Sequence, residues 1–194
     1  CKNCPAVLAA AKEYGLLAIP GMEICTSEEV HAVCLFPDLE PAMEFDKYVY
    51  DRLPDIKNRE DIFGKQEIYN SQDEKCGIID KLLINACSIS FDELWELTAS
   101  YSGVMFPAHI DKNANSLINN LGFIPPDSRF GTAEIFDLKN LHKLKAKEPY
   151  LENCRIISNS DAHYLPDIHE PVLTIPVEER SAQGVIEYIR NRSK

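Results

Sequence analysis

Short apolar runs alternate with amphipathic segments along most of the chain. Residues 6–14 are rich in helix formers and are followed by a glycine, which predicts a first helix. Residues 30–36 are apolar except for His31, and a run of this length and composition predicts a strand. Because side chains alternate between the two faces of a strand, we expect His31 on the same face as Val33 and Leu35.

The second half of the chain continues this alternation. Ser90 and Glu93 form a capping-box pattern that opens a predicted helix ending near residue 102. Further strands are predicted at residues 104–109, 133–136 and 155–158, and a closing amphipathic helix at residues 181–192. Strands that alternate with helices predict an α/β fold built on a parallel sheet or an α/β barrel.

Residues 38–88 interrupt the alternation. One helix is expected over residues 40–52, before Pro54, and another over residues 78–87, with a polar stretch between them. We interpret this segment as a helical insertion within a single domain that spans residues 1–194, because one domain is the expectation at this length.

The composition narrows the class of protein. The chain has 194 residues, of which 45% are hydrophobic, and no low-complexity tract, so we expect a folded core. No apolar stretch approaches the length of a membrane-spanning helix, so no membrane partner is expected. The net charge of −11 disfavours long nucleic acids as partners. A small phosphorylated substrate is compatible with this charge if bound metal ions supply positive charge.

The chain contains seven cysteines, an odd number, so they cannot all pair within one molecule. Several lie in apolar runs, as small core residues do, and a reducing cytoplasmic location is the simpler interpretation. Cys1 and Cys4 have the spacing of a metal-binding or redox pair. No second pair or nearby histidine completes such a site, so we prefer a helix start there.

Residues that can bind metal collect at the ends of predicted strands. Glu23, His109 and the pair Asp161 and His163 each lie at a strand end, and His31 lies within another strand. Functional groups in parallel α/β folds gather at the carboxyl ends of strands, so we expect these five side chains to meet. Their oxygen and nitrogen donors suit Zn, Mn or Fe better than a site made of thiolates alone.

Three sequence blocks resemble motifs of the PHP (polymerase and histidinol phosphatase) superfamily. The segment IPGMEI at residues 19–24, followed by EVH at residues 29–31, is similar to the glutamate and histidine strand motifs of that family. PAHIDK at residues 107–112 looks like the family's AHPDR motif, and SDAH at residues 160–163 matches its motif of the same sequence. The order and spacing of the blocks also fit, over essentially the whole chain.

The resemblance implies a distorted (β/α)7 barrel of TIM type with up to three divalent metal ions and phosphoesterase activity. Glu23 would bridge two ions, His31 and His109 would bind one of them, Asp161 the other, and His163 a third. The metal cluster would polarise a phosphoryl group and activate water. No catalytic residue is assigned beyond these ligands.

The resemblance also implies ligands that this sequence lacks. The family's first two motifs, an H-x-H and an Asp-His pair, normally precede the helix predicted here at residues 6–14, and the chain begins at Cys1. Either the chain is a fragment of a protein that has both motifs and the first barrel strands, or it is a degraded homologue. We favour the fragment because the downstream ligands are present, and we expect this chain to be weakly active or inactive as it stands, with its metal sites partly or wholly empty.

Four further polar residues are candidates for contacting substrate or orienting a ligand: Asp111, Lys112, Asn159 and His169. The alternative for each is a structural or solvated position. Lys112 stands where the family motif has Arg, which weakens the case for an Arg-specific phosphate contact. Glu134 lies on a predicted strand, and we expect a buried polar residue held by hydrogen bonds rather than a ligand.

Three functions compete. Metal-dependent hydrolysis of a small phosphorylated metabolite or nucleotide agrees best with the ligands and the motifs, without separating phosphomonoesterase from nuclease activity. A degraded PHP domain with a structural or regulatory role is the alternative that the missing motifs raise. A metal-dependent amidohydrolase is weaker, because its lysine or additional histidine ligands are not evident.

Overall fold

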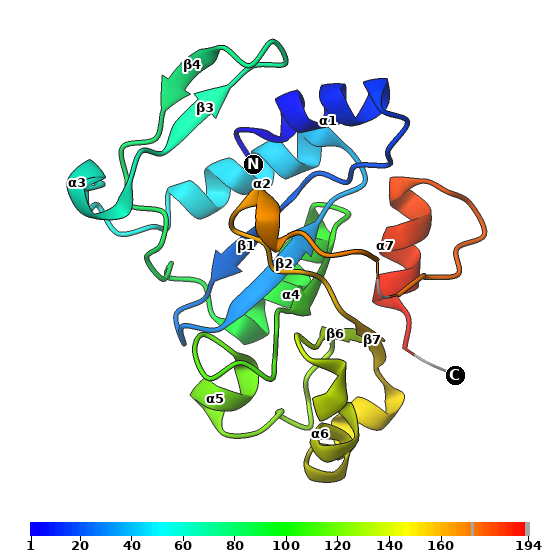
Figure 1. The fold of residues 1–194 in the computed structure, drawn as a ribbon. Coiled ribbons are helices and arrows are strands. Elements are labelled where there is room, and N and C mark those ends of the chain that lie inside the picture. Colours follow the sequence, from blue (N-terminus) through cyan, green and yellow to red (C-terminus); the bar gives the residue numbers. More distant parts are fainter. Residues whose placement is uncertain (172, 193–194) are drawn as a thin grey trace.

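A three-stranded antiparallel sheet lies at the centre of the molecule (Figure 1). The computed structural model describes residues 1–171 and 173–192. The strands β1 (Gly21–Cys25), β2 (His31–Leu35) and β5 (Val104–Pro107) lie in the order β1-β2-β5. Both neighbouring pairs are antiparallel, with Glu23 opposite Val33 and Val33 opposite Phe106.

Helices cover both faces of this sheet. The helices α2 (Leu39–Tyr50) and α4 (Phe91–Ser100) contribute to the main core, together with the side chains that β2 and β5 direct to that face, such as Cys34 and Met105. The helix α7 (Ala182–Arg190) packs on the opposite face, where Val33 and Leu35 lie with Val104 and Phe106. The alternation along β2 places His31 on this second face, as predicted.

A parallel pair of strands extends the structure beyond the end of β5. The strands β6 (Thr132–Glu134) and β7 (Arg155–Ile157) pair with each other, and the Ile110 N–H just after β5 donates to the carbonyl of Glu134 at 2.9 Å. The helices α5 (Leu117–Leu121) and α6 (Leu141–Lys147) lie in the connections around this pair, below the central sheet in Figure 1. In the described residues, three short 3-10 helices lie in the second half of the sequence: Leu138–Asn140, Pro149–Asn153 and Leu165–Asp167.

The insertion after α2 is only partly helical. It contains a one-turn helix, α3 (Glu60–Phe63), and a hairpin of β3 (Glu67–Tyr69) and β4 (Lys75–Ile78) that projects beside α1 (Cys4–Glu13) in Figure 1. The Asn3 side chain, just before α1, accepts a hydrogen bond from the Tyr69 N–H at 2.8 Å and so joins the hairpin to the chain start.

The helix predicted over residues 78–87 is wrong. The backbone N–H groups of this segment donate hydrogen bonds to other segments of the chain and do not form a helix. The Leu82 N–H donates to the carbonyl of Ile56 at 2.8 Å, and the Cys87 N–H donates to the carbonyl of Cys25 at 2.9 Å. The apolar side chains that suggested an amphipathic helix therefore do not form one buried face. Leu82 is buried, whereas Leu83 and Ile84 are exposed.

The predicted (β/α)7 TIM-like barrel is also wrong. In the described residues the strands form sheets of three, two and two strands, and only β6 and β7 are parallel. Residues 26–30, which join β1 to β2, form a short turn, whereas a parallel connection needs a crossover of a dozen or more residues. The first two strands of this chain therefore pair as a hairpin.

The capping signal at Ser90 predicted the start of α4 correctly. The capping box that opens α4 is present, because the Ser90 hydroxyl accepts from the Glu93 N–H and the Glu93 carboxylate accepts from the Ser90 N–H.

Among the helices of the described residues, none has both the length and the apolar character needed to span a membrane.

Candidate metal centre

The hairpin of β1 and β2 brings Glu23 and His31 together. The register pairs Cys25 with His31 and Glu23 with Val33, so Glu23, Cys25 and His31 share the face of the sheet on which α7 packs. The turn between the strands is fixed by the buried Thr26, whose side chain accepts from the Val30 N–H at 3.3 Å. Two predicted ligands are thus positioned by a local structure.

The third residue, His109, lies just after the end of β5. The Ala108 N–H donates to the carbonyl of His31 at 3.0 Å, which holds the end of β5 against β2. His109 is 4% exposed and has a φ of 29°, a left-handed conformation that costs a non-glycine residue about 1–3 kcal/mol. Such a conformation persists where surrounding contacts impose it.

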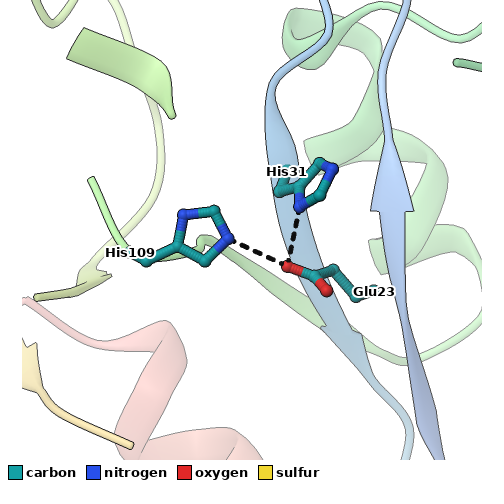
Figure 2. Close-up of side chains that lie close together, drawn as sticks. All are labelled: Glu23, His31 and His109. Carbon is teal, nitrogen blue, oxygen red and sulfur yellow. Dashed lines mark ion pairs between the residues drawn. The ribbon is translucent and has the colours of Figure 1, made fainter. Parts of the chain in front are cut away.

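The three side chains converge on one oxygen atom. Nδ1 of His31 lies 3.2 Å from Oε1 of Glu23, and Nε2 of His109 lies 3.3 Å from the same oxygen. Figure 2 shows both imidazole rings directed at this carboxylate, and the ring centroids are 5.4 Å apart. One donor atom from each residue lies within 4.8 Å of the others.

This spacing fits a metal ion. Donors at about 2.1 Å from a tetrahedral ion are about 3.4 Å from one another, close to the two distances observed here. Two imidazoles and a carboxylate form a donor set typical of zinc and of other first-row divalent ions. Glu23, His31 and His109 could therefore hold such an ion with only small movements of their side chains.

The two histidines and Glu23 shift one another's pKa values. Partial burial alone would raise the pKa of its carboxyl, but hydrogen bonds from His109 and His31 outweigh burial and lower this pKa to about 2. A hydrogen bond with Cys25 and the contact with Glu23 raise the pKa of His31 to about 9. The carboxylate is charged at neutral pH, whereas a metal ion would have to displace the proton that His31 holds at that pH.

A buried carboxylate behind the site holds two of its loops. Oε2 of Glu134 accepts from the His109 N–H at 3.0 Å, and Oε1 accepts from Nδ2 of Asn159 at 2.7 Å. Glu134 is 4% exposed, and burial raises the pKa of its carboxyl. The expectation that Glu134 is a buried residue held by hydrogen bonds is confirmed, and Asn159 is one of its hydrogen-bond donors.

Asp161 and His163 lie beside the three-residue cluster but do not join it. Oδ2 of Asp161 forms an ion pair with Nζ of Lys112, and Nε2 of His163 lies 3.8 Å from Oδ1 of Asp161. The side chain of His163 is 76% exposed, compared with 17% for Asp161. All of these residues line one cavity of about 520 Å³ together with Glu23, His31 and His109.

Asp111 and His169 lie outside the lining of this cavity. The Asp111 carboxylate accepts from the N–H groups of Phe136 and Asp137 and from Nδ2 of Asn140, so it fixes the loop after β5 to the end of β6. His169 is exposed, and its Nδ1 lies 2.8 Å from the carbonyl of Glu170.

Sequence reasoning missed five members of the cavity wall: Cys25, Leu83, Ile84, Ala114 and Asn115. Leu83 and Ile84 come from the insertion, and Cys25 faces His31 across the hairpin. The period of two along β1 could have indicated Cys25, because it places residues 23 and 25 on one face. No local pattern indicates that residues 83 and 84 reach the cavity, because their position depends on the path of the insertion.

Comparisons with known proteins support the fold alone. No family model and no curated protein matches this sequence. The structure is similar to the crystal structure of the lesion-specific endonuclease PfuEndoQ from Pyrococcus furiosus, with a TM-score of 0.53 and 17% sequence identity. The likeness covers 89% of this chain and 39% of that chain, so this chain spans less than half the length of its neighbour.

Proposed function

We propose that this chain is part of a metal-dependent phosphoesterase that hydrolyses a small phosphorylated substrate. The observation that carries the proposal is the convergence of Glu23, His31 and His109 on one point. A divalent cation held there would polarise a phosphate ester and lower the pKa of a coordinated water molecule. The motifs that resemble the PHP superfamily, and the fold shared with an endonuclease, support the same class of reaction.

The cavity beside the cluster supports a small substrate. Its volume of about 520 Å³ lies within the range of about 300–1,000 Å³ that is typical of small-molecule sites. Lys112 supplies a positive charge at the wall, which suits a phosphate group, and Leu83 and Ile84 supply an apolar surface for the remainder of the ester. Asn115 also lines the cavity, and its carbonyl accepts from the His31 N–H at 2.9 Å.

A DNA strand is the second candidate substrate, favoured by the likeness to a lesion-specific endonuclease. The net charge of −11 works against it, because nucleic-acid binding draws most of its affinity from basic side chains near the phosphates. We therefore rank a small phosphate ester first.

Metal binding to the chain tests the proposal directly. We expect isothermal titration with Zn²⁺ or Mn²⁺ to show binding that Glu23→Gln or His31→Asn weakens at least roughly tenfold, because each removes one of three ligands. His142→Asn is the matched control, because His142 is exposed on α6. Equal affinity in all four proteins would contradict the proposed centre.

Hydrolysis assays then separate the two substrates. The Mn²⁺-loaded protein is incubated with p-nitrophenyl phosphate, with nucleoside monophosphates and with a DNA duplex that carries a damaged base. Because we expect weak activity from this chain, even slow release of phosphate from the small esters supports the first candidate if Glu23→Gln abolishes it. Cleavage of DNA without turnover of the small esters would replace it with the second.

A further inference from the structure

Lys112 and Asp161 form an ion pair inside the cavity of the candidate metal centre, although they are 49 residues apart in the sequence. Lys112 follows β5 and Asp161 follows β7, so the pair joins the two loops that carry His109 and His163. Their side chains are 33% and 17% exposed, which makes this a partly buried pair rather than a solvated surface contact.

The ammonium group of Lys112 is held from more than one side. Its Nζ lies 4.4 Å from the centroid of the Phe136 ring, within the range of a cation–π contact. The backbone is also fixed, because the Lys112 N–H donates to the carbonyl of His109 at 2.9 Å and the Ser116 hydroxyl donates to the carbonyl of Lys112 at 2.7 Å. The positive charge therefore has a defined position beside Asp161.

This position conflicts with metal binding by Asp161. A divalent ion that approached the same carboxylate would meet a like charge at contact distance, in a site where solvent screening is reduced. The resemblance to the PHP superfamily assigns Asp161 and His163 to additional metal ions. The observed arrangement instead gives Asp161 a protein cation as its partner.

We propose that the Lys112 ammonium takes the place of a metal ion at Asp161, so that this chain holds one divalent ion, at Glu23, His31 and His109. The inference rests on the proposed metal centre. It also assigns a role to Lys112, because an ammonium in the cavity wall beside a single bound ion can contact a phosphate oxygen as a second positive charge.

Metal stoichiometry tests this inference without requiring turnover. We expect saturating Mn²⁺, measured by titration calorimetry and by elemental analysis after dialysis, to give one ion per wild-type chain. Lys112→Met keeps the length of the side chain and removes its charge, which frees Asp161, with His163 beside it, and we expect two ions per chain. Lys112→Arg keeps the charge, so we expect it to bind one ion per chain. Lys143→Met removes an exposed lysine on α6 and should also bind one ion per chain.

Two further variants make the outcomes distinguishable. Adding Asp161→Asn to Lys112→Met should return the stoichiometry from two ions to one, while Asp161→Asn alone should leave it at one. Circular dichroism confirms that each variant is folded. Two ions in the wild type, or one ion in folded Lys112→Met, would overturn the inference while leaving the proposed centre in place. Binding of one ion that Glu23→Gln does not weaken would contradict the proposed centre itself.

Discussion

The carboxylate of Glu134 accepts a hydrogen bond from the backbone N–H of His109 at 3.0 Å, and this contact holds the most deeply buried residue of the candidate metal centre. His109 has a positive φ, so its conformation depends on contacts such as this one. The same carboxylate holds Asn159, two residues before Asp161. Glu134 therefore links the loops that follow β5 and β7.

Replacing Glu134 with Ala should weaken both stability and metal binding. The buried N–H of His109 would lose its acceptor, at a cost of about 1–3 kcal/mol in the free energy of unfolding. Metal affinity should fall about 10–100-fold, as is typical when a group that orients a ligand is removed. Urea denaturation and metal titration measure the two effects.

Glu148 offers a matched control for this variant. It is 8% exposed, and its carboxylate accepts from the Ile124 N–H at 2.9 Å, outside the cavity of the candidate centre. Glu148→Ala should lower stability to a similar extent and leave the metal affinity unchanged. If both variants lost metal affinity equally, the effect would come from general destabilisation and not from the contact with His109.

Ile84 should contribute to binding of the organic part of a phosphate ester. Its side chain is exposed and lines the cavity, so a ligand with an apolar group would bury it. We expect Ile84→Ser to weaken binding of phenylphosphonate to the Mn²⁺-loaded protein about two- to fivefold, because part of one apolar contact is lost. Binding of methylphosphonate should not change.

Ile62→Ser is the control for this experiment, because Ile62 is also an exposed isoleucine of the insertion but lies outside the cavity. Calorimetric titration of both phosphonates into the wild type and the two variants gives the ratios of affinity. A loss of phenylphosphonate binding of the same size in Ile62→Ser would remove the support for an apolar subsite.

Stability should fall at alkaline pH because of Cys34. Burial raises the pKa of this thiol to about 12, whereas in the unfolded chain it ionises near its ordinary value of 9.0. The folded state thus keeps a proton that the unfolded state loses, and stability declines as the pH rises from about 9 towards 12, by at most about 1.4 kcal/mol per pH unit for one group.

Thermal unfolding between pH 8 and about pH 11 checks this dependence. Cys34→Ala removes the titrating group, so its midpoint should decline less steeply with pH than that of the wild type. Parallel pH profiles for the two proteins would show that other groups cause the alkaline loss of stability.

The capping box of α4 should stabilise the fold locally. Ser90→Ala removes the hydroxyl that accepts from the Glu93 N–H, and we expect a loss of about 1 kcal/mol in the free energy of unfolding. Ser71→Ala, in the exposed turn between β3 and β4, should have little effect. Chemical denaturation measures the stability of both variants. Equal denaturation midpoints for Ser90→Ala and Ser71→Ala would argue against a capping contribution.

Much of the candidate site could be predicted from the sequence because its first part is local. Glu23 and His31 lie on paired strands joined by a short turn, and periodicity places His31 on one face with Val33. Residues near one another along the chain meet with a small loss of chain entropy, so local patterns carry this information. His109 was predicted from its place at a strand end, and the resemblance of its motif agreed, but only distant contacts bring it to the same point.

The overall architecture was less predictable because strand direction depends on distant segments. The strands β2 and β5 are separated by the whole insertion and pair antiparallel, which no local pattern specifies. Alternating strands and helices therefore suggested a barrel that the structure does not form. The segment at residues 78–87 failed as a helix for a similar reason, since its backbone bonds to residues such as Ile56 and Cys25.

The sequence by itself determined where most strands and helices form, the capping of α4, and which donor groups the chain carries for a metal ion. Only the tertiary structure decided that Lys112 pairs with Asp161, that Glu134 holds His109, and that Glu23 meets both histidines. The reason is physical. Periodicity and capping are properties of neighbouring residues, whereas the partner of a buried charge depends on which loops the packed core brings together.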